Sequence, residues 1–146
     1  MNENEMTGHV VNYMKAIEYQ LNCIIENFFI PSQNTGFFSN VLLNSSVVSF
    51  GSKIKVIKTI CNYKNTIFDP KKLHRLNSIR NIFAHEGTFV DTTVGDFQLI
   101  DELQSGGKYK TYKLKELFEE FRSLYDLEFP KIAKLNEGLS KNETNS

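Results

Sequence analysis

Residues 69–87 read DPKKLHRLNSIRNIFAHEG and contain an amphipathic helix together with its start and stop signals. Asp69 supplies the side-chain acceptor typical of an N-cap, and Pro70 suits the first helical position. Gly87 is typical of the residue that follows a helix C-terminus. The large apolar residues recur at spacings of three and four, which places them on one side of the helix: Leu73, Leu76, Ile79, Ile82 and Phe83. That side must be buried against other elements.

Helical spacing recurs on both sides of this segment. Residues 4–30 predict one long helix, which the segment 31–36 ends. Residues 37–43 predict a short apolar helix. Residues 49–63 predict a further helix, with a strand as the alternative because β-branched residues are frequent there. Residues 114–135 predict a last helix, which Pro130 kinks or restarts.

Residues 88–111 lack helical spacing and separate the last two helices. Thr88-Phe89-Val90 and Tyr109-Lys110-Thr111-Tyr112 can pair as a small β-hairpin over the turn Ser105-Gly106-Gly107. Residues 139–146 predict a disordered tail. We therefore expect an all-α fold: one helical bundle of four to five helices over residues 1–138, with a hairpin before the last helix.

Composition indicates an ordinary globular protein. With 146 residues, 40% apolar and 23% charged, the chain fits one soluble domain, and it has no apolar run of roughly 18 residues that could span a bilayer. The polar, acidic segment Met1–Glu5 does not resemble a secretory signal, so we expect a cytoplasmic location. Cys23 and Cys61 lie among apolar residues without a CxxC or a His/Cys cluster. They predict two buried thiols rather than a disulfide or a metal site.

The charges are unevenly distributed although the net charge is zero. From Lys53 to Arg80 the chain carries eight basic residues, and only Asp69 opposes them. Such a stretch can create a local positive field. We interpret Lys53, Lys72 and Arg75 as candidate contacts for RNA phosphates. The alternative is that these side chains are simply the solvated faces of two helices.

Arg80-Asn81 followed by His85 is the pattern that points to chemistry. Asn81 and His85 are four residues apart, so on a helix the amide can orient the imidazole. Arg80 and His85 are five apart, about 140° around an ideal helix. They meet at one phosphate only if the arginine swings over, the helix loosens near Gly87, or two chains combine their residues. A structural interpretation is equally open, in which His85 complements the helix dipole and Arg80 binds Glu86.

This segment, Ile79 to His85, resembles the signature of HEPN domains. With the earlier segment Ser49-Phe50-Gly51-Ser52-Lys53-Ile54, it is most similar to the mannitol-operon-repressor-like branch, over about Val10 to Leu135. The resemblance implies a helical bundle and a homodimer. It also implies metal-independent RNA cleavage with Arg80, Asn81 and His85 as catalytic residues, one motif per protomer across the interface. Neither a metal nor a cofactor is expected.

Three functions follow from these observations. The first is an endoribonuclease with a toxin-like or antiphage defence role, in which histidine transfers protons and arginine holds the phosphate. The second is a non-catalytic regulator that binds a protein partner, such as a transcription factor or an antitoxin, because the branch that the chain resembles is associated with regulation. The third is a structural dimerisation module. Gly87 stands where related toxins carry a tyrosine that their antitoxin modifies, so that form of silencing is not expected.

Overall fold

The computed structural model describes residues 1–29, 38–44, 46–84 and 99–141. Along the chain these residues form α1 (Glu3–Phe29), the π-helical turn η1 (Phe38–Leu42), α3 (Phe50–Tyr63), α4 (Lys71–Ala84), β1 (Leu99–Leu103), β2 (Tyr109–Lys113) and α5 (Leu114–Lys141). The described residues are mostly helical and contain one small antiparallel sheet, which confirms a helical bundle with a hairpin.

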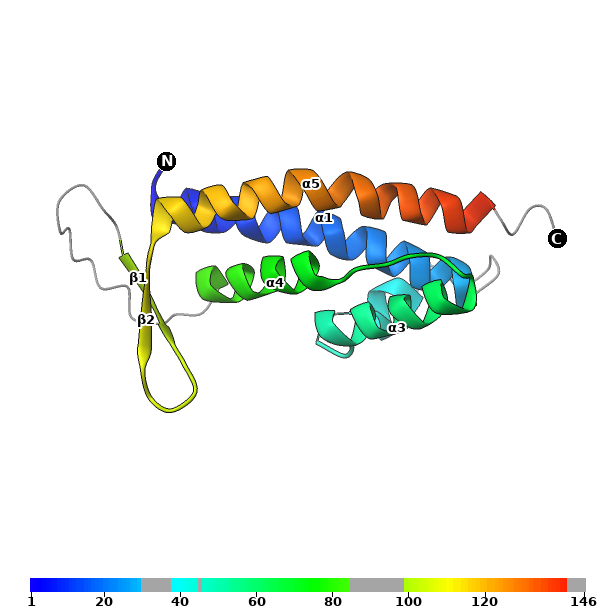
Figure 1. Ribbon diagram of the computed structural model, residues 1–146, viewed down its shortest axis with the longest axis horizontal. Coiled ribbons are helices and arrows are strands. Elements are labelled where there is room, and N and C mark those ends of the chain that lie inside the picture. The colour runs from blue at the N-terminus through cyan, green and yellow to red at the C-terminus, as the bar shows by residue number, and fades with distance from the viewer. Residues whose placement is uncertain (30–37, 45, 85–98, 142–146) are drawn as a thin grey trace.

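The two long helices, α1 and α5, lie side by side and run in the same direction (Figure 1). Their contacts follow the same order along both helices: the His9 ring lies near Phe118, Tyr13 stacks on Tyr125, and the Asn27 amide donates to the Ser140 hydroxyl. Below this pair, α4 and α3 follow one another along its length. α3 therefore packs against the second half of α1, and α4 against the first half.

The core lies where these four helices meet. It is built from the predicted apolar stripes, among them Val10, Ile17 and Leu21 of α1, Leu73, Leu76 and Ile79 of α4, and Leu117 and Phe121 of α5. Burial of each such side chain stabilises the fold by roughly 1.5–3 kcal/mol. None of the helices in the described ranges is both long and apolar enough to cross a bilayer.

The predicted helix starts are confirmed by their capping contacts. The Ser49 hydroxyl accepts a hydrogen bond from the Ser52 backbone N–H at 3.2 Å, so residues 50–63 form a helix and not a strand. An Asp69 carboxylate oxygen accepts from the Lys71 N–H at 3.1 Å. At its other end α4 is described as far as Ala84, so the predicted stop at Gly87 lies outside the described residues.

The last helix is longer than the sequence analysis predicts. α5 continues through Pro130 to Lys141, so the prediction of a tail from Leu139 is wrong for its first three residues. Leu139 belongs to the buried core, and the Ser140 hydroxyl donates to the Asn136 carbonyl at 2.9 Å. The reason is the apolar spacing Ile132, Leu135, Leu139, which extends the stripe for another turn. Residues 142–146 lie outside the described part of the chain.

The hairpin is present, but one of its predicted strands is wrong. β2 and the turn lie where expected, with Gly106 and Gly107 at φ of +93° and +77°. The partner of β2 is Leu99–Leu103, with Leu103 opposite Tyr109 and Leu99 opposite Lys113. The short turn brings only the adjacent segment alongside β2. Thr88–Val90, the strand predicted instead, lies outside the described residues.

Candidate functional site

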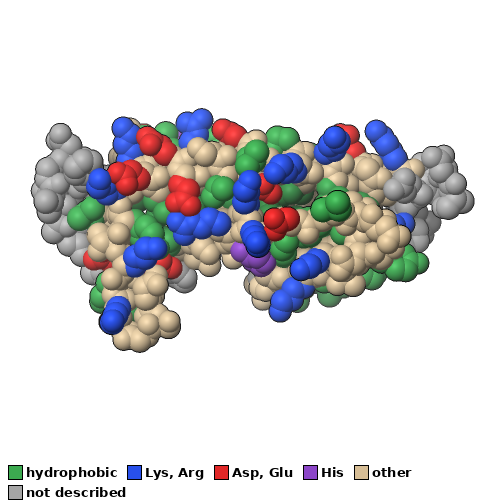
Figure 2. All heavy atoms as spheres, viewed as in Figure 1, with side chains coloured by type: hydrophobic (Ala, Val, Ile, Leu, Met, Phe, Trp, Pro, Cys, Tyr) green, Lys and Arg blue, Asp and Glu red, His purple; other side chains and the backbone are tan. Residues whose placement is uncertain are grey.

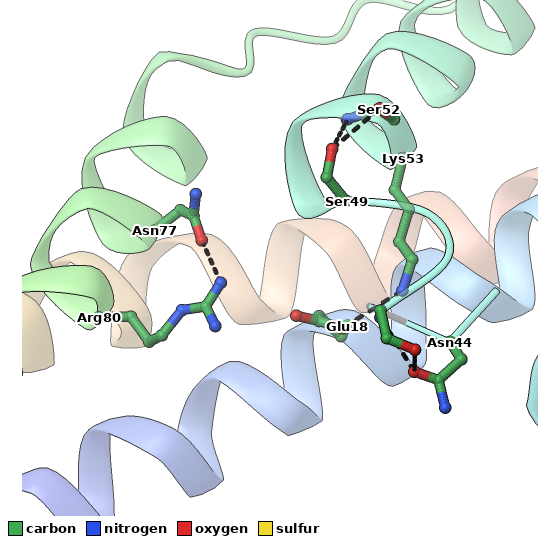
Figure 3. A network of polar contacts seen from close by, with 8 residues as sticks. Glu18, Asn44, Ser49, Ser52, Lys53, Asn77 and Arg80 are labelled. Atoms are coloured by element: carbon green, nitrogen blue, oxygen red, sulfur yellow. Dashed lines mark hydrogen bonds and ion pairs between the residues drawn. The ribbon is translucent and has the colours of Figure 1, made fainter. Parts of the chain in front are cut away.

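The polar site centres on the space between α4 and the start of α3, above α1. Figure 3 shows Asn77 and Arg80 extending from α4 toward this space, with Lys53 of α3 and Glu18 of α1 on its other side. Three helices, α1, α3 and α4, therefore place charged and amide side chains near one another. Apolar stripes on the same helices hold them in position, because Leu76, Ile79 and Ile54 next to these polar residues are buried.

A hydrogen bond orients the Arg80 side chain. One terminal nitrogen of its guanidinium donates to the Asn77 side-chain oxygen at 2.7 Å, while the buried Nε has no hydrogen-bond partner among the described residues. Within the described ranges no carboxylate forms an ion pair with it. The side chain is half-buried, and a guanidinium offers planar, forked N–H donors of the kind that suit a phosphate.

Asn77 is a functional candidate that the sequence analysis missed. It precedes Arg80 by three residues, and side chains at that spacing are neighbours on a helix surface. Because an amide carries no charge, it directs the guanidinium without cancelling the positive field, as a carboxylate would. The spacing of three residues between Asn77 and Arg80 could have identified Asn77 from the sequence.

The position of Lys53 contradicts its predicted role as a contact for RNA phosphates. Its side chain is fully buried, and its ammonium pairs with a Glu18 carboxylate oxygen at 3.3 Å. A group enclosed in this way cannot contact an RNA phosphate at the surface. The helical period explains the burial, since Lys53 precedes the buried Ile57 by four residues and Ile60 by seven. Lys53 instead connects α3 to α1 beside the polar site.

Arg75 forms an ion pair within the chain. Its guanidinium donates twice to the Glu120 carboxylate, at 2.6 and 2.8 Å, and so joins α4 to α5. This bond raises the pKa of Arg75 and lowers the pKa of Glu120. Lys72, the third predicted RNA contact, stands at the opposite end of α4 from the motif and lies 4.0 Å from Glu128. The three predicted cations are therefore not brought together at one surface.

Of the two remaining motif residues, Asn81 is described and His85 is not. Asn81 is half-buried on α4 directly after Arg80. His85 lies outside the described residues, so its contact with Asn81 stays a prediction. His74 is exposed on the same helix. Within the described ranges no cluster of three or more histidine, cysteine or acidic side chains could hold a metal ion.

Comparison of the chain with protein-family models, with curated proteins and with solved structures finds no match. The HEPN resemblance therefore rests on the motif residues alone and stays a prediction. What the geometry supplies by itself is an arginine that an amide on the same helix orients. An arginine of this kind can bind an anionic phosphate group.

Proposed function

We propose that the chain is a metal-independent endoribonuclease of the HEPN type that acts as a homodimer. The observation that supports this most strongly is the state of Arg80, which Asn77 orients and no described carboxylate neutralises. A structural arginine on a helix face is more commonly paired with an acid, as Arg75 is with Glu120. A cellular role in toxin-like or antiphage defence is consistent with this activity.

The proposed reaction is an internal transfer at phosphorus. His85 takes the proton from a ribose 2′-hydroxyl, whose oxygen then attacks the adjacent phosphorus. The bond from phosphorus to the 5′-oxygen breaks, and His85 of the partner subunit protonates that oxygen. Arg80 binds the non-bridging oxygens as their charge increases. The products are a 2′,3′-cyclic phosphate and a 5′-hydroxyl end.

The first experiment measures cleavage of a mixed panel of RNAs by the purified full chain and by His85→Ala. We expect the wild type to produce cyclic phosphate ends and His85→Ala to lose roughly 100-fold or more of the rate. Light scattering on the same samples should show a dimer. A wild-type preparation that leaves every RNA intact would remove the enzymatic proposal and favour the regulator that binds a protein partner.

The second experiment tests the role of Asn77. Asn77→Ala should lower the cleavage rate about tenfold, because Arg80 then loses the contact that directs it. Asn77→Asp should lower it further, since an ion pair would neutralise the guanidinium. Ser78→Ala is the matched control: among the described residues, the exposed Ser78 hydroxyl bonds to the His74 carbonyl of its own helix. Equal rates for Asn77→Ala and Ser78→Ala would exclude a positioning role.

A further inference from the structure

A cavity of about 510 Å³ lies at the other end of α4, away from Arg80. The segment from Thr66 to Asp69, the start of α4 and the second half of α5 form its walls. Its volume falls in the range of small-molecule sites, roughly 300–1,000 Å³. The site is independent of the proposed ribonuclease chemistry, because it contains none of the motif residues.

The interior of this cavity is apolar. Ile132 and Leu139 contribute core side chains at its base, while Phe68 and Leu135 are half-buried beside them. Ile67 lines the cavity too, yet 97% of its surface is exposed to water. A ligand that covers both this exposed aliphatic side chain and the apolar cavity beside it would remove apolar surface from water, which favours binding.

The charged side chains at this site comprise three lysines and two acids. Lys72, Lys131 and Lys134 line the cavity, whereas the acids are Asp69 and Glu128. Glu128 is buried, and its carboxylate is compensated by Lys131 at 3.2 Å and Lys72 at 4.0 Å. Lys134 has no ion-pair partner among the described residues. Figure 2 shows Lys and Arg side chains spread along α5, interspersed with Asp and Glu and with hydrophobic side chains.

We propose that this cavity binds a small amphipathic anion, with an apolar body against Phe68 and Ile132 and an acidic head at Lys134. A medium-chain carboxylate or alkyl phosphate has this chemistry. A nucleotide fits less well, because the polar edges of its base need partners. The Thr66 hydroxyl already donates to the Lys64 carbonyl, and the Glu128 carboxylate is already paired.

Calorimetric titration of the full chain tests the proposal with four probes: decanoate, decyl phosphate, decanol and adenosine monophosphate. We expect decanoate and decyl phosphate to bind one to one, and decanol to bind about fivefold more weakly, since a solvent-exposed charge contact contributes modestly. The stronger of the two anionic probes identifies the head group. Decanol that binds as tightly as the stronger anionic probe, adenosine monophosphate that binds when neither anionic probe does, or an absence of binding by both decanoate and decyl phosphate each overturns the proposal.

Two variants locate the site. Lys134→Glu should weaken decanoate binding at least fivefold, whereas Lys115→Glu, the same charge change at an exposed position elsewhere on α5, should leave it unchanged. Gly138 lines the cavity and has open space where a side chain would begin, so Gly138→Phe should block binding without unfolding the protein. Unchanged binding in a folded Gly138→Phe protein, or equal losses in both lysine variants, would place decanoate elsewhere.

Discussion

The buried ion pair between Lys53 and Glu18 gives a sharp test of the packing between α1 and α3. The Lys53 side chain is fully enclosed, whereas 19% of the Glu18 side chain remains exposed. Removing either partner therefore has unequal consequences. Glu18→Gln leaves an ammonium in the interior without an anion, while Lys53→Met leaves a carboxylate that water can still reach.

The expected magnitudes follow from this asymmetry. Glu18→Gln should lower the free energy of unfolding by about 3–5 kcal/mol, the usual effect of leaving one charge of a buried pair uncompensated. Lys53→Met, which keeps the length of the side chain, should lower it by only ~1–2 kcal/mol. The double variant should lie within ~1 kcal/mol of the wild type, because it removes both charges together and leaves neither of them uncompensated in the interior. Against a typical stability of roughly 5–15 kcal/mol, these differences are large.

Urea unfolding followed by far-UV circular dichroism measures all four proteins of this cycle. Midpoints should shift at constant m-value, and the coupling free energy should reach at least ~2 kcal/mol. A cycle with no coupling, or Lys53→Met proving more harmful than Glu18→Gln, would refute the reasoning. Lys55→Met, at an exposed position on the same helix, is the control and should change stability little.

Three further predictions concern single residues. Glu120 has a lowered folded-state pKa because of Arg75, so the pair stabilises the fold above the ordinary glutamate pKa, and this contribution is lost as the pH falls through the lowered value. Glu120→Gln should therefore cost ~0.5 kcal/mol at neutral pH and nothing in strong acid, as urea midpoints at both pH values would show. Gly138→Ala should raise the unfolding free energy by ~0.5–1 kcal/mol, since glycine is a poor helix residue and the added methyl group meets no atom within 4 Å. Burial raises the pKa of Cys61, so mass spectrometry after alkylation should find that thiol modified only when the chain unfolds, and modification of the native protein at the unfolded rate would contradict its burial.

Much of the fold could be predicted from local sequence because burial imposes a period on each helix. The stripes of α1 and α4, the Ser49 cap and the start at Asp69 all depend on residues within one or two helical turns. β1 was missed because Asp101 and Glu102 interrupt its apolar character. The parallel arrangement of α1 and α5 has no local signal, since it depends on contacts such as Gln20 with Asn136, which are 116 residues apart.

The candidate site was predicted less completely for a related reason. The sequence places Arg80 and Asn81 correctly on a helix, and Asn77 could have been found from its spacing to Arg80. The surroundings of the other cations are set by distant residues: Glu18 lies 35 residues from Lys53, and Glu120 lies 45 from Arg75. Residue type alone suggested that Lys53 is exposed and that Arg75 is free to bind RNA. In the folded chain, each of them forms an ion pair with a carboxylate from a distant part of the sequence.

The two arginines of α4 provide the most direct test of the proposed chemistry, because Arg75 is paired with Glu120, whereas Arg80 bonds to the Asn77 amide and pairs with no carboxylate of the described residues. The measurement is the initial rate of RNA cleavage by Arg80→Ala and Arg75→Ala, each first shown to be folded. Arg80→Ala should lose roughly 100- to 1,000-fold of the rate, and Arg75→Ala should retain at least half. Comparable rates in both variants would contradict the assignment of Arg80 to the scissile phosphate.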